Sequence, residues 1–269
     1  QALIVNKVEL SDSHFKKLDS LKYIGVTATG YNNIDINSAA DRGIAVSNVA
    51  GYSTTSVAQH VFAFILNHFS RVSEYDAEVK KGTWLESKDF CFYKTPTEEI
   101  AEKTIGIIGY GAIGRKVAAI AEAFDLEILV GAVPGQHYSD SRASFEELIS
   151  RADIITLHCP LTEKTQNCID ADSLALLKNT AIIINTARGG LLDEQATANA
   201  LEKGLFAHLY TDVLGEEPPK KDNPLLSVPN VTFTPHIAWG TRQARKRLIS
   251  EVGLNLESFK QGQKRNRIV

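Results

Sequence analysis

The chain has 269 residues, of which 43% are hydrophobic and 23% are charged, and its formal net charge is −3. These values are typical of a globular protein with one large or two ordinary domains, and the slightly acidic balance argues against a nucleic-acid partner. The longest apolar runs, such as residues 61–66, are far too short to span a bilayer, so we expect no membrane partner.

The chain contains three cysteines, Cys91, Cys159 and Cys168, and no two of them have the CxxC spacing. An odd number without that spacing predicts reduced thiols in a cytoplasmic protein, with neither a disulfide framework nor a metal site. Methionine is absent and the first residue is Gln1, so we expect the natural chain to begin further upstream.

The first hundred residues predict a mixed region. We expect strands at residues 21–27 and 44–47, with a helix over 34–42 between them. A long apolar helix is expected over residues 53–70, and residues 80–100 are expected to be rich in loops because their aromatic residues show little periodicity.

From about residue 100, expected strands alternate with expected helices, which predicts a parallel sheet covered on both faces. The expected strands are 103–108, 127–132, 152–158, 181–185, 207–211 and 231–234. The expected helices are 113–124, 145–150, 173–177 and 194–203, with a last helix over about 241–260. The predicted fold class is therefore α/β, with a Rossmann-type doubly wound parallel sheet.

The stretch KTIGIIGYGAIG places Gly109, Gly111 and Gly114 between an expected strand and an expected helix. In a dinucleotide site, such glycines allow the tight turn, the close approach of backbone to pyrophosphate, and the close packing of helix on strand. The helix that follows offers free N–H groups and the positive end of its dipole. A simple glycine turn is the structural alternative, but the flanking strand and helix favour a dinucleotide cofactor.

The second part of that fingerprint is an acidic residue, about 20 residues further on, that holds the ribose hydroxyls. The strand ends instead in Ala132, Val133 and Pro134. Arg142 is the nearest downstream candidate for binding an additional phosphate. The expected cofactor is NAD, and NADP is left open.

Three charged or titratable residues follow expected strands of the same sheet. Arg188 follows IIINTA, Glu217 follows YTDVLGE, and His236 follows VTFTP. Ligands of open parallel sheets bind at the carboxyl ends of the strands, where the glycine loop also lies. We therefore expect the three side chains to converge beside the nicotinamide.

The three residue types fit the reduction of a 2-keto acid. An arginine binds a carboxylate with two parallel hydrogen bonds, and a histidine can give a proton to a ketone oxygen while hydride arrives at the carbon. A neighbouring carboxylate stabilises the imidazolium and fixes its orientation. Each residue alone has a structural alternative, such as a surface ion pair, but their joint occurrence favours catalysis. His158, which also ends a strand, is expected to line the cofactor pocket.

At these residues the chain resembles the D-isomer-specific 2-hydroxyacid dehydrogenases. The motifs follow in the family's order and spacing over nearly the whole chain: GIIGYGAIG, ADIITLHCPLTEKTQNCI, NTARGGLLDE, TDVLGEEPP and NPLLSVPNVTFTPHIAW. Within the family, the chain is most similar to bacterial glycerate dehydrogenases (hydroxypyruvate reductases), through VTATGYNNID, DFCFYKTP and TPHIAWG.

The resemblance implies that Arg188 binds and polarises the substrate, that Glu217 supports the histidine, and that His236 donates the proton. It also implies that the backbone of Thr29 and Gly30 binds the substrate carboxylate, where a glycine lets N–H groups approach an anion closely. The implied cofactor contacts are Gly109, Gly111, Ala112, Ile113, Gly114, His158, Cys159, Pro160, Thr165, Thr186, Ala187, Arg188 and Asp212.

The resemblance also implies an architecture of two domains. An NAD-binding domain is expected at residues 49–238, and a flavodoxin-like substrate domain is expected to combine residues 1–48 with 239–269. Family chains usually begin several dozen residues earlier, so we expect this substrate domain to lack its N-terminal part. The helix at 53–70 and the arm after it are expected to form a homodimer interface, with burial inside one chain as the alternative.

The expected reaction is a reversible hydride transfer between the nicotinamide cofactor and a small 2-keto or 2-hydroxy acid. Hydroxypyruvate and D-glycerate are the expected pair, with glyoxylate as a further substrate, and Trp239 is expected to shape the pocket or to pack as a structural aromatic. The alternatives are a D-lactate or 3-phosphoglycerate dehydrogenase, or a non-catalytic NAD-sensing protein like the corepressors of this fold. Formate dehydrogenases of the superfamily carry glutamine in place of Glu217, which argues against that activity.

Overall fold

The computed structural model of the chain describes residues 1–136, 138 and 142–269. The chain folds into two compact units. Unit 1 combines residues 1–56 with residues 239–269, and unit 2 is the continuous segment 57–238. Both ends of the chain therefore belong to the same unit.

Unit 1 is built on a parallel sheet of three strands in the order β1-β2-β3. The strands are β1 (Ala2–Val5), β2 (Tyr23–Val26) and β3 (Ala45–Ser47), and the helices are α1 (Asp12–Phe15), α2 (Ile36–Asp41) and α9 (Arg242–Lys260). All four residues of β2 are buried, because this strand is central in the sheet and α9 packs against it. The rings of Tyr23 and Phe259 lie 4.8 Å apart at this contact.

Hydrogen bonds tie the last residues of the chain to the first fifty. The side-chain amide of Asn255 donates to the carbonyl oxygen of Asn48 at 2.9 Å. The backbone N–H of Ile268 donates to the carbonyl oxygen of Val46 at 2.7 Å, so the C-terminal residues run beside β3. The fold of unit 1 thus depends on segments that are far apart in sequence.

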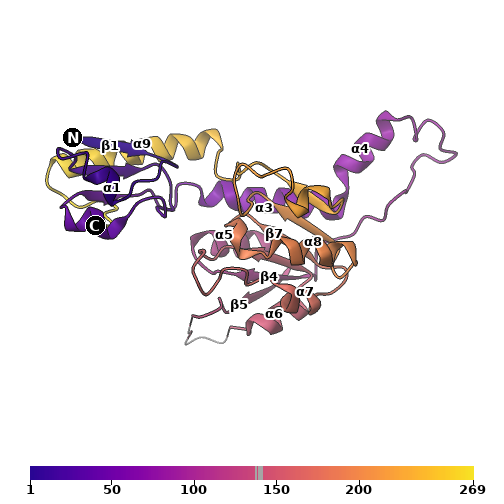
Figure 1. Ribbon diagram of the computed structural model, residues 1–269. Coiled ribbons are helices and arrows are strands. Elements are labelled where there is room, and N and C mark those ends of the chain that lie inside the picture. Colours follow the sequence, from indigo (N-terminus) through magenta and orange to yellow (C-terminus); the bar gives the residue numbers. More distant parts are fainter. Residues whose placement is uncertain (137, 139–141) are drawn as a thin grey trace. The chain divides into compact units, whose positions relative to one another are not determined.

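Unit 2 contains a sheet of six parallel strands in the order β5-β4-β6-β7-β8-β9 (Figure 1). The strands are β4 (Thr104–Ile108), β5 (Glu127–Gly131), β6 (Ile154–Leu157), β7 (Ile182–Asn185), β8 (His208–Thr211) and β9 (Val231–Phe233). The helices are α3 (Thr54–Ser70), α4 (Val72–Lys80), α5 (Ala112–Glu122), α6 (Phe145–Arg151), α7 (Ala171–Ala175) and α8 (Glu194–Glu202), with short 3-10 helices at Gly189–Leu191 and Pro224–Ser227.

Alternate residues of the strands belong to two apolar cores, one on each face of this sheet. Ile182 and Ile184 of β7 lie in the core that α3 and α5 cover. Ile183, between them, lies in the core that α6, α7 and α8 cover. Since successive side chains of a strand point to opposite faces, a continuous apolar run is what a sheet covered on both faces requires.

The predicted α/β class and Rossmann-type sheet are confirmed, and each element expected beyond residue 100 is present within three residues of its expected bounds. Strand β1 and helices α1 and α4 lie outside the predicted elements. Helix α4 escaped prediction because it has no apolar stripe, and its buried residue is Glu78.

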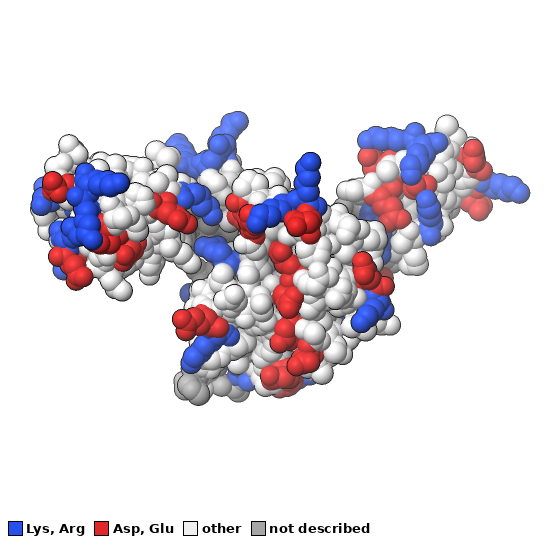
Figure 2. Space-filling view, viewed as in Figure 1, with Lys and Arg blue, Asp and Glu red and all other residues white. Residues whose placement is uncertain are grey.

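Residues 71–99 form an arm that begins with α4 and extends away from the sheet of unit 2 (Figure 1). Large apolar side chains of this arm are exposed: Leu85 is 90% exposed, Phe90 is 89% exposed and Tyr93 is 80% exposed. Charged residues of both signs are interspersed over the arm (Figure 2), including the ion pair of Lys80 with Asp76 at 2.6 Å.

Among the helices of the described residues, none is both long enough and apolar enough to cross a membrane.

Candidate active site

All six strands of unit 2 are parallel, so their carboxyl ends lie at one edge of the sheet. The residues predicted for cofactor binding and catalysis follow these ends: Gly109 after β4, His158 after β6, Thr186 after β7, Asp212 after β8 and His236 shortly after β9. The chain leaves β4 toward β5 on one side and returns to β6 on the other, which makes the end of β4 the topological switch point where such sheets bind ligands.

The glycine loop lies at this switch point. Gly109 has a φ of +100°, and a Cβ there would lie 2.4 Å from the backbone nitrogen of Cys159. A Cβ on Gly114 would lie 2.3 Å from the carbonyl oxygen of Gly109, so α5 approaches the loop more closely than any side chain would allow. A Cβ on Gly111 would meet nothing within 4 Å, which leaves open space at the start of α5.

The residues around the loop fit a dinucleotide. Gly111 is the N-cap of α5 and has no side chain to bond the first N–H groups, so those of Ala112 and Ile113 would be available to a pyrophosphate. The hydroxyl of Thr186 is buried and has no hydrogen-bond partner among the described residues. A buried hydroxyl without a partner is costly, and a bound cofactor would supply one.

His158 is held in its neutral form beside the loop. Its Nε2 lies 2.9 Å from the hydroxyl of Thr156, and burial lowers the pKa of His158 to about 3. A neutral, buried imidazole suits a pocket wall and does not suit a proton donor at neutral pH.

The segment after His158 is shaped by its own hydrogen bonds. The hydroxyl of Thr165 donates to the carbonyl oxygen of Pro160 at 2.7 Å and accepts from the backbone N–H of Thr162 at 2.8 Å. Cys159 is buried, and its hydrogen bond with Cys168, together with burial, raises the pKa of the Cys159 thiol. Of these residues, Cys159 lies against Gly109, and the roles of Cys159, Pro160 and Thr165 as cofactor contacts stay a prediction.

The end of β5 carries no acid, as the sequence shows. The backbone N–H of Ala132 donates to the carbonyl oxygen of Ala143 at 3.0 Å. The guanidinium of Arg142 lies 3.9 Å from the ring centroid of Tyr138, in a cation–π contact.

Arg188 lies in a turn that follows Asn185, the last residue of β7. Asn185, which is fully buried, accepts the N–H of Ala187 at 3.0 Å and donates to the carbonyl oxygen of Arg188 at 2.9 Å. The guanidinium donates to the carbonyl oxygen of Ala187 at 2.6 Å. The next residue, Gly189, touches another loop: a Cβ there would lie 1.9 Å from the backbone carbon of Leu214.

This contact explains the first of the two glycines that follow Arg188. It brings the loop after β7 against the loop after β8, and the second loop leads to Glu217. Glu194 fixes the same loop, because its carboxylate accepts the N–H of Gly215 at 2.7 Å.

Glu217 and His236 form the pair that the sequence predicted. Nδ1 of His236 lies 2.6 Å from Oε2 of Glu217, and Oε1 accepts the backbone N–H of Leu214 at 3.2 Å. His236 has a φ of +53°, a left-handed conformation that a non-glycine residue adopts only where the surroundings enforce it.

Asp212 holds the backbone around His236 in this conformation. Its carboxylate accepts the N–H groups of Ile237 at 2.8 Å and Ala238 at 2.9 Å, and the hydroxyl of Thr234 at 2.5 Å. Its backbone carbonyl oxygen accepts the N–H of His236 at 2.8 Å. Asp212 therefore brackets the loop that carries the histidine, and its role as a cofactor contact stays a prediction.

In unit 1, Thr29 and Gly30 follow β2 at the carboxyl edge of the smaller sheet. Asn48 donates to the carbonyl oxygen of Thr29 at 2.7 Å, and the hydroxyl of Thr29 donates to the carbonyl oxygen of Val49 at 3.0 Å. Neither backbone N–H of Thr29 or Gly30 donates to another described residue. These two N–H groups are suited to an anion.

Sequence reasoning missed the residues that position the pair. Asn185 and Glu194 are the first and last residues of the motif NTARGGLLDE, but neither of them was assigned a role from the sequence. The bonds of Asp212 to the His236 loop depend on the packing of β8 against β9. The one signal in the sequence was that Asp212 directly follows a buried strand, and this signal did not indicate which groups Asp212 would bond.

The fold and the glycine loop are those of a dinucleotide-dependent dehydrogenase. The model of the family described as "D-isomer specific 2-hydroxyacid dehydrogenase, NAD binding domain" matches residues 62–238. The chain belongs to this family, and it is an NAD(P)-dependent oxidoreductase that acts on a CH–OH group.

Curated relatives extend the similarity to both units. The chain is 39% identical to a glycerate dehydrogenase of Methylorubrum extorquens, over 98% of this chain and 83% of the relative. It is 38% identical to a hydroxypyruvate reductase of Blautia hydrogenotrophica, over 96% of this chain and 81% of the relative. Among solved structures, an acyclic imino acid reductase (Bsp5) in complex with NADPH and D-Arg has a TM-score of 0.87 and 33% identity, and the match covers 100% of this chain and 85% of that one.

Proposed function

We propose that this protein interconverts hydroxypyruvate and D-glycerate, with glyoxylate as a further substrate. The observation that carries the proposal is the pairing of His236 with Glu217 at 2.6 Å, on the sheet edge that also holds the glycine loop and Arg188. The similarity to a glycerate dehydrogenase and a hydroxypyruvate reductase supports the same substrate pair.

In this proposal the residues divide the work. The guanidinium of Arg188 binds the substrate and polarises its keto oxygen, while the N–H groups of Thr29 and Gly30 hold the carboxylate. The bound nicotinamide supplies the hydride. Nε2 of His236 gives its proton to the oxygen as the carbonyl becomes an alcohol, and Glu217 stabilises the imidazolium and fixes the ring. Oxidation of the hydroxy acid reverses each step.

NAD is the proposed cofactor. The guanidinium of Arg142, the candidate for an additional phosphate, lies against the ring of Tyr138. The absence of an acid at Ala132 removes the usual discrimination against NADP, so both cofactors belong in the assay.

The test is hydroxypyruvate reduction by the purified protein, followed through the loss of reduced-cofactor absorbance, with NADH and NADPH in parallel. We expect turnover that His236→Ala abolishes without loss of cofactor binding. Tight cofactor binding without turnover on hydroxypyruvate, glyoxylate, pyruvate or 3-phosphohydroxypyruvate would instead support the non-catalytic, NAD-sensing alternative.

We also propose that the protein is a cytoplasmic homodimer and that the arm of residues 71–99 contributes to the interface. Support comes from the exposed apolar side chains of Leu85 and Phe90 and from the ordered contacts within the arm, such as the bond from the Trp84 indole N–H to the carbonyl oxygen of Phe90 at 2.9 Å.

Light scattering coupled to size exclusion tests this assembly. We expect a dimer that Leu85→Ser with Phe90→Ser converts to a monomer, whereas Leu176→Ser, at a 45% exposed leucine of the sheet region, leaves the mass unchanged. A monomeric wild-type protein would contradict the proposal.

A further inference from the structure

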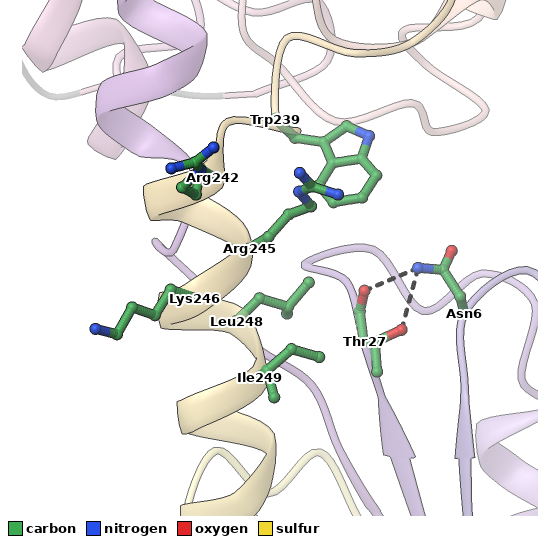
Figure 3. A pocket seen from close by; sticks show the side chains of 8 residues that line it. All are labelled: Asn6, Thr27, Trp239, Arg242, Arg245, Lys246, Leu248 and Ile249. Atoms are coloured by element: carbon green, nitrogen blue, oxygen red, sulfur yellow. Dashed lines mark hydrogen bonds between the residues drawn. The ribbon is translucent and has the colours of Figure 1, made fainter.

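A pocket of about 550 Å³ lies within unit 1, and among its lining residues only Trp239 was also considered for the substrate pocket. Asn6 and Thr27 line it where β1 and β2 end, and Trp239, Arg242 and Arg245 line it from the start of α9 (Figure 3). It thus occupies the carboxyl edge of a parallel sheet, where open α/β sheets bind their ligands.

The pocket is strongly cationic. Arg242, Arg245 and Lys246 all line it, and none of their side chains forms an ion pair or hydrogen bond with another described residue. No acidic residue is found among the described residues that line it. The positive end of the α9 dipole adds to this potential.

The positions of these cations follow from the helix. Arg242 is three residues from Arg245 and four from Lys246, so it neighbours each of them on α9, whereas the adjacent residues Arg245 and Lys246 point in different directions. Figure 3 shows the Arg245 side chain reaching toward the ring of Trp239, while the Lys246 side chain extends from the other side of α9.

Below the guanidinium groups the pocket is apolar. Leu248 and Ile249 form an apolar floor, and the indole of Trp239 provides an aromatic wall that the edge-on ring of Tyr52 supports, with centroids 6.3 Å apart.

A polar acceptor completes the pocket. The side-chain amide nitrogen of Asn6 donates to the carbonyl oxygen and to the hydroxyl of Thr27, at 3.0 and 3.1 Å, which fixes the orientation of the amide (Figure 3). No bond to Oδ1 of Asn6 is found among the described residues, so this oxygen can accept a ligand hydroxyl.

We propose that this pocket binds a small organic phosphate whose phosphate group is held by Arg242 and Arg245 and whose ring or apolar part lies against Trp239 and Leu248. Unpaired guanidinium groups at helical spacing favour a doubly charged, multidentate anion over a single carboxylate. The aromatic wall and apolar floor favour a ligand with more than the phosphate itself.

Fluorescence of Trp239 gives a direct readout of binding. The chain has two tryptophans, so Trp84→Phe leaves Trp239 as the single indole. In this background we would titrate phenyl phosphate, which carries both a ring and a phosphate, beside inorganic phosphate and benzoate, which carry one feature each. We expect saturable binding, tightest for phenyl phosphate and weakened by added salt.

Variants distinguish this pocket from a general attraction to positive charge. Arg245→Gln is expected to weaken phenyl phosphate binding by about tenfold, because one charge-assisted contact is lost. Lys264→Gln removes the same charge from an exposed residue of unit 1 outside the pocket and is expected to leave the affinity unchanged. His236→Ala is also expected to leave it unchanged.

The proposal is overturned if no saturable change is seen, if benzoate binds as tightly as phenyl phosphate, or if Arg245→Gln and Lys264→Gln behave alike. Circular dichroism and the thermal midpoint of Arg245→Gln show whether the variant is folded, and Arg242→Gln repeats the test independently. Because the readout is binding and not turnover, these outcomes are separate from the test of the dehydrogenase activity.

Discussion

Glu217 contacts both His236, the proposed proton donor, and the backbone of the loop that leads to Glu217 itself. One carboxylate oxygen bonds Nδ1 of His236, and the other accepts the N–H of Leu214. A carboxylate with both oxygens engaged in this way cannot rotate freely, so the imidazole is oriented before substrate arrives.

Replacing the charge while keeping the shape tests this role. Glu217→Gln is expected to lower kcat for hydroxypyruvate by about 100-fold, because the imidazolium loses its stabilising partner, while KM changes little. Steady-state kinetics over a range of pH provide the measurement. Glu216→Gln is the matched control, since Glu216 pairs with Lys220 at 2.7 Å on the surface, and equal losses in both variants would contradict the assignment.

Gly189 carries a second residue-scale prediction. A Cβ at this position would lie 1.9 Å from the backbone carbon of Leu214, so Gly189→Ala must push the two loops apart. We expect a loss of about 3 kcal/mol or more in the free energy of unfolding, measured with urea, and a fall in kcat.

Gly253→Ala is the control, because we expect it to raise the free energy of unfolding where Gly189→Ala lowers it. Gly253 lies in α9, and a Cβ there would meet nothing within 4 Å. Alanine is expected to stabilise this helix by about 0.5–1 kcal/mol. A similar response of both glycines would refute the close-approach argument.

Residues of the site differ in how far sequence alone could predict them. Arg188, Glu217 and His236 could be proposed because each follows a strand, and parallel strands end at one edge. The bracket of Asp212 around the histidine loop could not, because an acid's partners are set by the loop that folds over it. The close contact of Gly189 likewise requires the three-dimensional path of another loop.

Among the secondary-structure elements, α3 ends in a cluster of aromatic and titratable groups at the base of the arm. Nδ1 of His68 lies 3.1 Å from the hydroxyl of Tyr210, and the ring of His208 lies 5.8 Å from that of His68. Arg71 and Lys103 disfavour a positive charge here, while Glu98 favours it. Burial is the largest cause, and it lowers the pKa of both histidines to about 4.

This cluster predicts a pH dependence of stability. The folded-state pKa values lie near 4 and the ordinary value is 6.5, so between these pH values the unfolded chain binds more protons. The two histidines therefore favour the folded state fully above pH 6.5, and this contribution is lost as the pH falls toward 4.

Urea unfolding at pH 7.5 and pH 5 measures the effect. The wild-type protein is expected to lose stability on acidification, and His208→Gln is expected to lose less of it. His14→Gln, at an exposed histidine of unit 1, is the control, and an unchanged wild-type midpoint between the two pH values would contradict the prediction.

The elements that the sequence could predict are those with a regular apolar pattern. Strands β4 to β9 and their helices carry apolar runs or stripes that give a clear period. Helix α4 is stabilised instead by polar contacts, in which Glu78 bonds Lys81 at 2.9 Å and Lys94 at 3.0 Å. Such polar contacts leave no apolar period to detect in the sequence.

At the scale of the whole molecule, unit 1 depends on its C-terminal residues. Backbone bonds link residues 266–269 to Val46 and Asn48, and Ile268 and Val269 pack against the apolar core of the unit. Unit 2 has its own two cores and does not include these residues.

Removing residues 263–269 is therefore expected to destabilise unit 1 while unit 2 retains NADH binding. In the Trp84→Phe background, the emission of Trp239 reports unit 1, and NADH fluorescence reports unit 2. A truncated protein whose Trp239 transition is unchanged, or whose NADH binding is lost as well, would contradict this division.

In the sequence, unit 2 lies between the two segments of unit 1, and this order determines which unit is synthesised completely first. Residues 57–238 leave the exit tunnel before α9 is synthesised, so the cofactor-binding sheet can close while unit 1 still lacks the helix that covers β2. Until α9 has been synthesised, the side of that small sheet that α9 covers has no intramolecular cover. The nascent chain is expected to depend on a chaperone at this stage, for a time set by the synthesis of residues 239–269.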